Sequence, residues 1–168
     1  SDPAEVPQIR RSIVRYLITE APIERNVLIR KVLSDWGVAR QTDKAEAVFD
    51  KAMEGVSCTR TTEYSSDGVK YFYWRADQDE NTYPYYRVED KSGELRTLDV
   101  IPYAEIRNAI KEVLEAQISL AEEDLIKETV KCFGFSRTGA VSSKCCKAAF
   151  ERGLTEGWLK SGADRYSL

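Results

Sequence analysis

The chain has 168 residues, of which 42% are hydrophobic and 32% charged, with a formal net charge of -3 and a sequence pI of about 5.2. This balance is that of a soluble globular protein with one compact domain or two small ones, and the acidic pI argues against indiscriminate coating of nucleic acid. No apolar run approaches the roughly 20 residues that span a bilayer, and no secretory signal is visible, so we expect a cytoplasmic protein without a membrane partner.

Histidine is absent, and the four cysteines lack CxxC spacing. A structural zinc site is therefore not expected. The commonest general base is also missing, with every Ser/His/Asp or Cys/His arrangement, so catalysis would have to rest on carboxylates, lysines or tyrosines. The sequence predicts no metal, no cofactor, no small-molecule substrate and no enzymatic activity of its own.

Three helices are predicted first along the chain, over residues 7–21, 23–36 and 42–53. Pro7 is well placed in a first helical turn, and Gly37 is a natural left-handed cap for the second helix. The apolar faces are predicted from helical spacing as Ile9, Ile13, Tyr16 and Leu17, then Ile23, Val27, Leu28, Val32, Leu33 and Trp36, then Ala45, Val48, Phe49, Ala52 and Met53.

After Gly55 the spacing of apolar residues changes from 3.6 to 2, which indicates strands. Residues 56–64 and 69–74 are rich in Thr, Tyr, Val and Phe, and residues 65–68 are typical of a hairpin turn. Three helices followed by a hairpin is the order of a winged helix. We therefore predict a first winged-helix-like unit over residues 8–75, after a lead-in at residues 1–7.

Four aromatic residues alternate along the second hairpin strand. Phe72 and Trp74 share one face and are expected to seal the core. Tyr71 and Tyr73 share the other face, where they could stack on bases or pack under the aromatic connector of residues 76–101, and packing is favoured.

Residues 76–101 form a connector with an excess of acidic residues, 7 Asp and Glu against 3 Lys and Arg. The run Tyr83-Pro84-Tyr85-Tyr86 makes it too aromatic for a loose linker. We expect an ordered segment that packs across both units.

The chain repeats itself without a gap at an offset of 97 residues. The identical positions are Ile9, Arg10, Ile13, Leu17, Leu28, Ile29, Gly37, Arg40, Ala52 and Glu54 against Ile106, Arg107, Ile110, Leu114, Leu125, Ile126, Gly134, Arg137, Ala149 and Glu151. Most of these positions are apolar and lie at helical spacing, so the repeat preserves a fold. It also preserves one turn, marked by Gly37 and Gly134.

A second unit over residues 102–168 follows from this repeat, with helices at 103–116, 120–133 and 140–156 and a shorter hairpin at 158–168. We predict a mainly α fold with small β-hairpins, of class α+β, built as a tandem duplication of two winged-helix-like units.

The second unit resembles an uncharacterised domain at the C terminus of large bacterial proteins in the stretches Ile101-Pro102-Tyr103-Ala104-Glu105-Ile106, Asp124-Leu125-Ile126-Lys127 and Phe133-Gly134-Phe135-Ser136-Arg137-Thr138-Gly139. The rest of the chain is similar to the same domain in Glu20-Ala21-Pro22-Ile23, in Trp36-Gly37-Val38-Ala39-Arg40, and in Tyr86-Arg87-Val88 with Gly93. Those bacterial proteins join a superfamily 1 helicase to a Vsr-like endonuclease domain, whose motifs lie outside this chain. The resemblance implies no catalytic residue, and the family often has glycine in place of Ala21.

The third helix of the second unit is the best candidate for a functional surface, because residues 136–154 carry four basic residues against Glu151 alone. Its outer face suits contacts with a nucleic-acid backbone, while Val141, Cys145, Ala148 and Ala149 are expected to face the core. The candidate binding residues are Arg137, Ser142, Ser143, Lys144, Lys147 and Arg152, together with Arg40 and Lys44 in the first unit.

Arg40 and Arg137 stand three residues after the two cap glycines. An arginine just before a helix N terminus can clamp phosphate together with the free N–H groups of that helix. It can equally pair with a carboxylate or with the last carbonyls of the preceding helix. Both interpretations stay open from the sequence.

These observations predict a non-catalytic accessory module that binds nucleic acid, DNA more than RNA, within a larger helicase-nuclease-like protein. The alternative is a docking module that uses the same folds to bind another protein domain of the parent. The polarised charge of the second unit favours the first function, and the weak overall charge favours the second.

Overall fold

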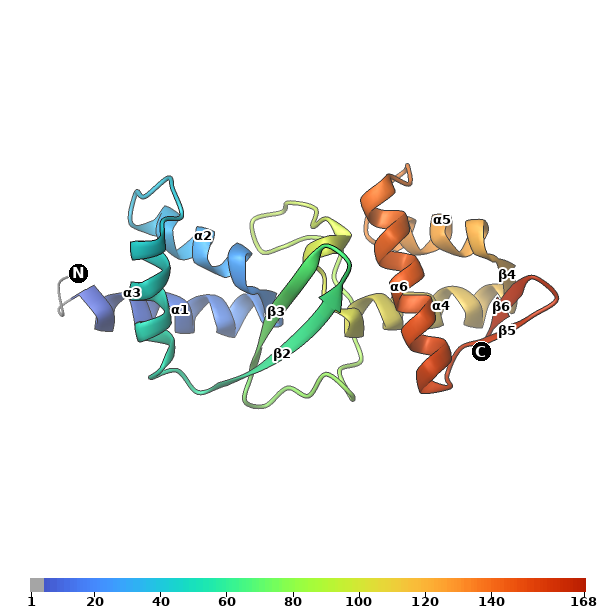
Figure 1. Cartoon of the computed structure of the whole chain (residues 1–168), viewed down its shortest axis with the longest axis horizontal. Coiled ribbons are helices and arrows are strands. Elements are labelled where there is room, and N and C mark those ends of the chain that lie inside the picture. Colours follow the sequence, from blue (N-terminus) through green and yellow to red (C-terminus); the bar gives the residue numbers. More distant parts are fainter. Residues whose placement is uncertain (1–4) are drawn as a thin grey trace. The chain divides into compact units, whose positions relative to one another are not determined.

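A computed structural model describes residues 5–168 of the chain (Figure 1). Within this range the protein contains six α-helices and two three-stranded antiparallel sheets, so the predicted α+β class is confirmed. The chain divides into two compact units, the first ending at Asp79 and the second beginning at Glu80. The first four residues of the predicted lead-in lie outside the described range.

The first unit consists of α1 (Glu5–Glu20), β1 (Ile23–Glu24), α2 (Arg25–Asp35), α3 (Asp43–Met53), β2 (Cys58–Ser65) and β3 (Gly68–Arg75). Its sheet has the order β1-β3-β2, with Ile23 opposite Tyr73 and Thr61 opposite Phe72. The hydrophobic core lies between the helices and one face of the sheet. Its buried members are Ile13, Leu17, Ala21, Ile23, Leu28, Ile29, Val32, Phe49, Ala52 and Tyr73.

The start of α2 differs from the prediction, because the helix begins two residues later than its apolar pattern, with Glu24 as its cap. Glu24 is buried, and its Oε2 accepts hydrogen bonds from the backbone N–H groups of Asn26 and Val27. This satisfies donors that every helix N terminus leaves unpaired. Ile23 and Glu24 form β1 instead, a strand too short to produce a visible alternation in the sequence.

The end of α2 is formed by Gly37, which adopts the left-handed conformation that the sequence predicted. Its N–H donates to the carbonyl of Ser34, and the N–H of Val38 donates to that of Leu33. Trp36 was predicted on the buried face, but it is 43% exposed. The prediction was wrong because α2 ends at Asp35, so Trp36 no longer follows the helical face.

The two faces of β3 also pack differently from the prediction. Tyr73 lies in the core of the first unit, with its ring 6.4 Å from that of Phe49 and its hydroxyl 3.2 Å from Nη1 of Arg25. Phe72 and Trp74 are buried on the opposite face of the strand, where Nε1 of Trp74 donates to Oγ1 of Thr61. Phe72 and Trp74 are therefore buried as predicted, but it is Tyr73 that belongs to the core formed with the helices, so both faces of β3 are buried.

The second unit consists of a 3-10 helix, η1 (Leu98–Val100), then α4 (Tyr103–Gln117), β4 (Ser119–Ala121), α5 (Glu122–Cys132), α6 (Ala140–Glu156), β5 (Lys160–Gly162) and β6 (Arg165–Ser167). Its sheet has the order β4-β6-β5. The core is larger than that of the first unit and includes Leu98, Ile101, Ile106, Ile110, Leu114, Leu125, Ile126, Phe133, Cys146 and Phe150.

The two units share their order of helices and strands and the order of strands in their sheets. The helices α2 and α5 begin and end 97 residues apart. The turn at Gly134 repeats the turn at Gly37: both glycines have positive φ, and the N–H of Phe135 donates to the carbonyl of Val130, as that of Val38 does to Leu33. The repeated residues of the sequence therefore fall on repeated features of the backbone.

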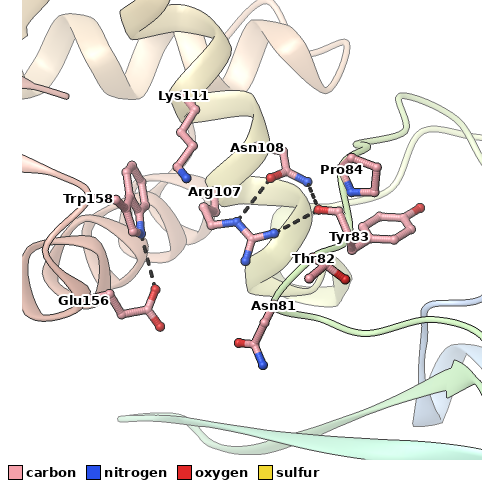
Figure 2. Close-up of a pocket in the computed structure, with 9 residues that line it drawn as sticks. All are labelled: Asn81, Thr82, Tyr83, Pro84, Arg107, Asn108, Lys111, Glu156 and Trp158. Carbon is pink, nitrogen blue, oxygen red and sulfur yellow. Dashed lines mark hydrogen bonds between the residues drawn. The ribbon is translucent and has the colours of Figure 1, made fainter.

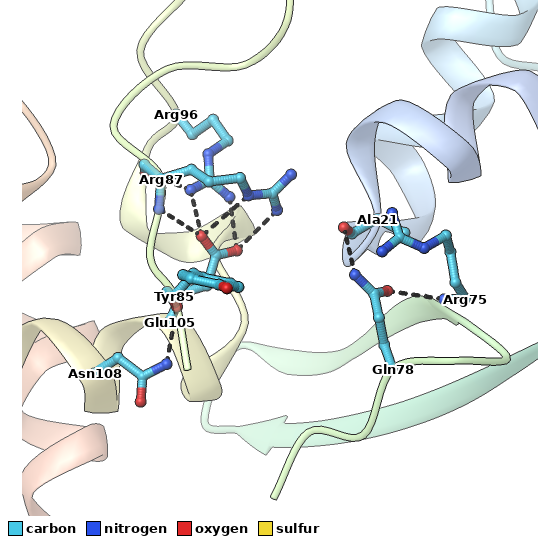
Figure 3. A network of polar contacts seen from close by, with 8 residues as sticks. All are labelled: Ala21, Arg75, Gln78, Tyr85, Arg87, Arg96, Glu105 and Asn108. Carbon is cyan, nitrogen blue, oxygen red and sulfur yellow. Dashed lines mark hydrogen bonds and ion pairs between the residues drawn. The ribbon is translucent and has the colours of Figure 1, made fainter. Parts of the chain in front are cut away.

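The division between the units falls inside the predicted connector. Residues 76–79 are held on the first unit by Gln78, whose Nε2 donates to the carbonyl of Ala21 and whose Oε1 accepts from the backbone N–H of Arg75 (Figure 3). Residues 80–101 belong to the second unit. They contain little regular structure apart from η1 and a bridge between Glu89 and Leu95.

A buried carboxylate on α4 holds residues 87–96 in place (Figure 3). Glu105 is fully buried, and its carboxylate oxygens lie 2.9 Å from Nη2 of Arg87 and 2.8 Å from Nη2 of Arg96. The backbone N–H of Arg87 also donates to Glu105, at 2.9 Å. Burial alone would raise the pKa of Glu105, but the hydrogen bonds from Arg96 and Arg87 hold that pKa below its usual value.

Between residues 5 and 168, no helix combines the length and the apolar character that crossing a membrane requires.

Candidate nucleic-acid interface

The buried face of α6 lies about one residue from its predicted position. Cys146, Ala149, Phe150 and Gly153 face the core, whereas Val141 and Ala148, predicted to be buried, are exposed and Cys145 is half-buried. Phe150 and Gly153 set this orientation. A methyl group on Gly153 would lie 2.7 Å from Cζ2 of Trp158, so the helix packs closely there.

The exposed face of α6 carries Lys144 and Lys147, whereas Ser142 and Ser143 are half-buried beside the core. The two lysines are three positions apart, so their side chains project from neighbouring positions on one helix face. On the buried side, burial raises the pKa of the Cys146 thiol to about 12. This thiol therefore stays protonated at neutral pH and packs as a small apolar group.

The N terminus of α6 is electrostatically positive. Its N-cap is Gly139, which offers no side-chain acceptor, and the first turn contains no acidic residue. The helix dipole therefore adds to the positive charge of the nearby lysines. By contrast, Thr42 caps α3, its Oγ1 accepting from the N–H of Ala45, and Asp43 and Glu46 occupy the first turn.

Arg137 and Arg40 are exposed in the equivalent turns before α6 and α3. Across residues 5–168, neither arginine forms a hydrogen bond or an ion pair. The pairing with a carboxylate or with carbonyls that the sequence left open is therefore not formed. Both side chains are exposed.

Arg152 lies apart from these residues, two helical turns beyond Lys144 and thus about 12 Å along the axis. Its Nε is 3.2 Å from Oε2 of Glu156, and its guanidinium lies 3.9 Å from the centre of the Tyr103 ring. The Tyr103 hydroxyl donates to Oε1 of Glu156 at 2.6 Å. Arg152 therefore stabilises the C-terminal end of α6 and lies apart from Arg137, Lys144 and Lys147 at its N-terminal end.

The candidate binding residues of the first unit, Arg40 and Lys44, lie near more acidic residues than those of α6 do. Lys44 is exposed on α3, whose acidic residues partly engage Arg25 of α2. Nη1 of Arg25 lies 2.6 Å from Oδ1 of Asp50, and its Nη2 lies 3.7 Å from Oε1 of Glu46. Arg40 and Lys44 thus belong to a different unit from the other candidates, on a surface of mixed charge.

An open cavity of about 360 Å³ lies in the second unit (Figure 2). It adjoins Glu156 at the C-terminal end of α6, whereas Lys144 and Lys147 lie toward the N-terminal end. Arg107 is buried beside it and donates to the carbonyls of Glu80 and Tyr83, while Nδ2 of Asn108 donates to those of Tyr83 and Tyr85. The cavity is lined by Asn81, Thr82, Tyr83, Pro84, Arg107, Asn108, Lys111, Glu156 and Trp158.

None of these lining residues was predicted as part of a site, although Arg107 was noted as a repeated position and Tyr83 and Pro84 as part of the aromatic connector. They come from three separate segments, so no local motif marks them. The ammonium of Lys111 lies 5.2 Å from the centre of the Trp158 ring, and Nε1 of Trp158 lies 3.3 Å from Oε1 of Glu156. Within the described part of the chain, no group of three or more Cys, Asp and Glu residues could hold a metal ion.

A family model described as "Protein of unknown function (DUF3320)" matches residues 1–47. The matched range extends through α1, β1 and α2 into the first turn of α3. No curated protein and no solved structure matches the chain. The predicted resemblance to an uncharacterised domain of unknown function is therefore supported over this part of the chain.

Proposed function

We propose that the chain is a tandem pair of winged helices and a non-catalytic accessory module that binds nucleic acid through the basic N-terminal face of α6. We define this basic face as Arg137, Lys144 and Lys147. The repeated element order, the repeated sheet order and the repeated glycine turn support the winged-helix duplication. In a winged helix the third helix, here α6, is the one that enters a groove of the duplex.

The observation that carries the proposal is the concentration of positive charge at the start of α6. Exposed Lys144 and Lys147 follow an exposed, unpaired Arg137, and the intervening helix N terminus contains no acidic residue. Phosphate oxygens accept hydrogen bonds from such side chains and from helix N termini. Sequence-independent contacts with a duplex backbone fit this chemistry best, and we propose DNA in preference to RNA because of the resemblance to a helicase-nuclease-like parent.

A place within a larger helicase-nuclease-like protein is the finer part of the proposal, and the resemblance of the sequence motifs supports it. In that setting the module would hold or orient the substrate of its parent. A moderate, salt-sensitive affinity suits such a role, because a neighbouring motor must be able to release the strand.

The double substitution Lys144→Glu and Lys147→Glu is expected to weaken binding to duplex DNA for all sequences. It should also flatten the dependence of log Kd on log salt by about one unit for each phosphate that the variant no longer neutralises. Both lysines are exposed, so the free energy of unfolding should change by no more than about 0.5 kcal/mol. Fluorescence anisotropy of a labelled duplex, measured at several salt concentrations, tests both effects.

The matched control is Lys51→Glu with Lys127→Glu, which changes the net charge by the same amount at two exposed lysines outside α6. This variant should keep most of the affinity and the salt slope. Equal losses of affinity in both variants would mean that overall charge, rather than the basic face, determines binding. If the wild-type protein binds neither DNA nor RNA at about 50 mM salt, where electrostatic contacts are strong, the protein-docking alternative takes its place.

A further inference from the structure

The turn between α5 and α6 is covered by a segment of its own unit. The ring of Tyr86 packs against that of Phe133, with centroids 5.5 Å apart, and Phe133 is fully buried. A methyl group on Gly134 would lie 2.7 Å from Cδ2 of Leu95 and 3.1 Å from Cγ1 of Val88. Residues 86–95 therefore cover the Gly134 turn with an aromatic residue and two branched apolar residues.

The equivalent turn of the first unit has the same backbone, but no segment among residues 5–168 covers its glycine. Apart from the chain neighbours Trp36 and Val38, no atom of these residues lies within 4 Å of where a methyl group on Gly37 would stand. Trp36, the counterpart of Phe133, is 43% exposed, and Val38, the counterpart of Phe135, is 44% exposed. Trp36 and Val38 are thus exposed side by side at a turn that backbone hydrogen bonds define, and contiguous exposed apolar surface of this kind can mark a binding site.

We propose that the α2–α3 turn of the first unit, formed by Trp36, Gly37 and Val38, docks an acidic peptide segment of another protein. The segment carries an aromatic residue and, two positions later, a branched apolar residue. The second unit supplies the template, in which Tyr86 and Val88 have this spacing and make the corresponding contacts. Docking at this turn is a function separate from nucleic-acid binding by the basic face of α6.

The charge of the segment follows from the residues beside the turn. Asp35 is already engaged, because its Oδ2 accepts from Ser12 and Arg15 and its Oδ1 from Tyr16. Arg40, on the other side of the turn, is exposed and unpaired among the described residues. Beyond it, exposed Asp43 and Lys44 have opposite charges, so with Asp35 engaged the turn keeps the positive charge of Arg40. The covering segment of the second unit matches this sign, since residues 86–95 contain Glu89, Asp90 and Glu94 against Arg87 and Lys91.

A synthetic peptide with the sequence of residues 82–95 and blocked termini is the probe, because it contains the template spacing and has more acidic than basic residues, Glu89, Asp90 and Glu94 against Arg87 and Lys91. Titrated into the ¹⁵N-labelled full chain, it should shift the backbone amide signals of residues 34–40. The substitutions Trp36→Ala and Val38→Asp should each abolish the shifts. A peptide with Tyr86→Ala and Val88→Asp should produce none, while Ile18→Ala, an exposed apolar position on α1, should leave them unchanged.

The outcomes separate the possible occupants of the turn. Absence of shifts at about 1 mM peptide, the affinity range of the weakest specific contacts, would overturn the proposal. Shifts located elsewhere would overturn it as well. A dimer in sedimentation experiments that Trp36→Ala disrupts would assign the turn to a second copy of the chain instead. Loss of DNA binding in Lys144→Glu with Lys147→Glu does not bear on these results, so the two proposals fail independently.

Discussion

Replacing Glu105 with glutamine is expected to lower the free energy of unfolding by about 3 kcal/mol, because removing one partner from a buried ion pair leaves the other charge uncompensated. Glu105 is fully buried between two guanidinium groups, and glutamine has nearly the same shape but no charge. Arg87 and Arg96 would then remain without their carboxylate. Urea unfolding followed by circular dichroism measures the decrease in stability.

The effect should depend on pH in a defined direction. The pKa of Glu105 is held below its usual value, so its contribution to stability is complete above the pKa of an unfolded carboxyl group. The contribution disappears as the pH falls through the lower pKa of the folded protein. The difference between wild type and Glu105→Gln should therefore be largest near neutral pH and shrink under acidic conditions.

Glu115→Gln is the matched control, because Glu115 is exposed on the same helix. This substitution should change stability by less than about 0.5 kcal/mol. If Glu105→Gln were no more destabilising than Glu115→Gln, the buried ion pair would not hold residues 87–96 in place.

Substituting alanine for Gly134 is expected to destabilise the protein by about 2 to 4 kcal/mol, whereas alanine at Gly37 should cost about 1 kcal/mol. Both glycines have positive φ, which alanine adopts only with strain. Only at Gly134 does the new methyl group meet neighbours, Leu95 and Val88, at overlapping distances. Thermal or urea unfolding of the two single variants measures the difference in stability. Because both variants share the backbone strain, this difference reports the contact of the new methyl group with residues 86–95.

A second pair of variants locates the cause of that difference. Leu95→Ala removes the closest neighbour, so Gly134→Ala should cost less in this background than in the wild type. Equal destabilisation at Gly37 and Gly134 would contradict the close packing of residues 86–95 on the turn.

The sequence predicted the structural features that depend on residues close together in the chain. The three helices of each unit, the hairpin turn before β3 and the conformation of Gly37 follow from spacing and glycine placement, and the structure contains them. The strands β1 and β4 were not predicted, because two or three residues show no alternation. Their positions depend on pairing with β3 and β6, which are distant in the chain.

The candidate site was predictable only in part, for the same reason. Charge placed Arg137, Lys144 and Lys147 near one helix N terminus, but it could not show that Arg152 is engaged by Glu156 and Tyr103. The rotation of α6 depends on Phe150 and on the close contact at Gly153, which are properties of the packed core. The cavity beside Arg107 combines segments that only the folded chain brings together.

The segment that covers the Gly134 turn, residues 86–95, is joined to α4 of its own unit by only a few residues. A segment that binds the Gly37 turn from another molecule has no such connection, and this difference affects how long it stays bound. A short tether keeps a binding segment at an effective concentration on the order of millimolar, so weak contacts remain saturated. The second unit adds an ion-pair anchor at Glu105, where the offset of 97 residues places Gln8 in the first. A segment that docks at Trp36 from another molecule has neither advantage, so it should exchange rapidly, and a lasting complex would require a partner that presents several such segments at once.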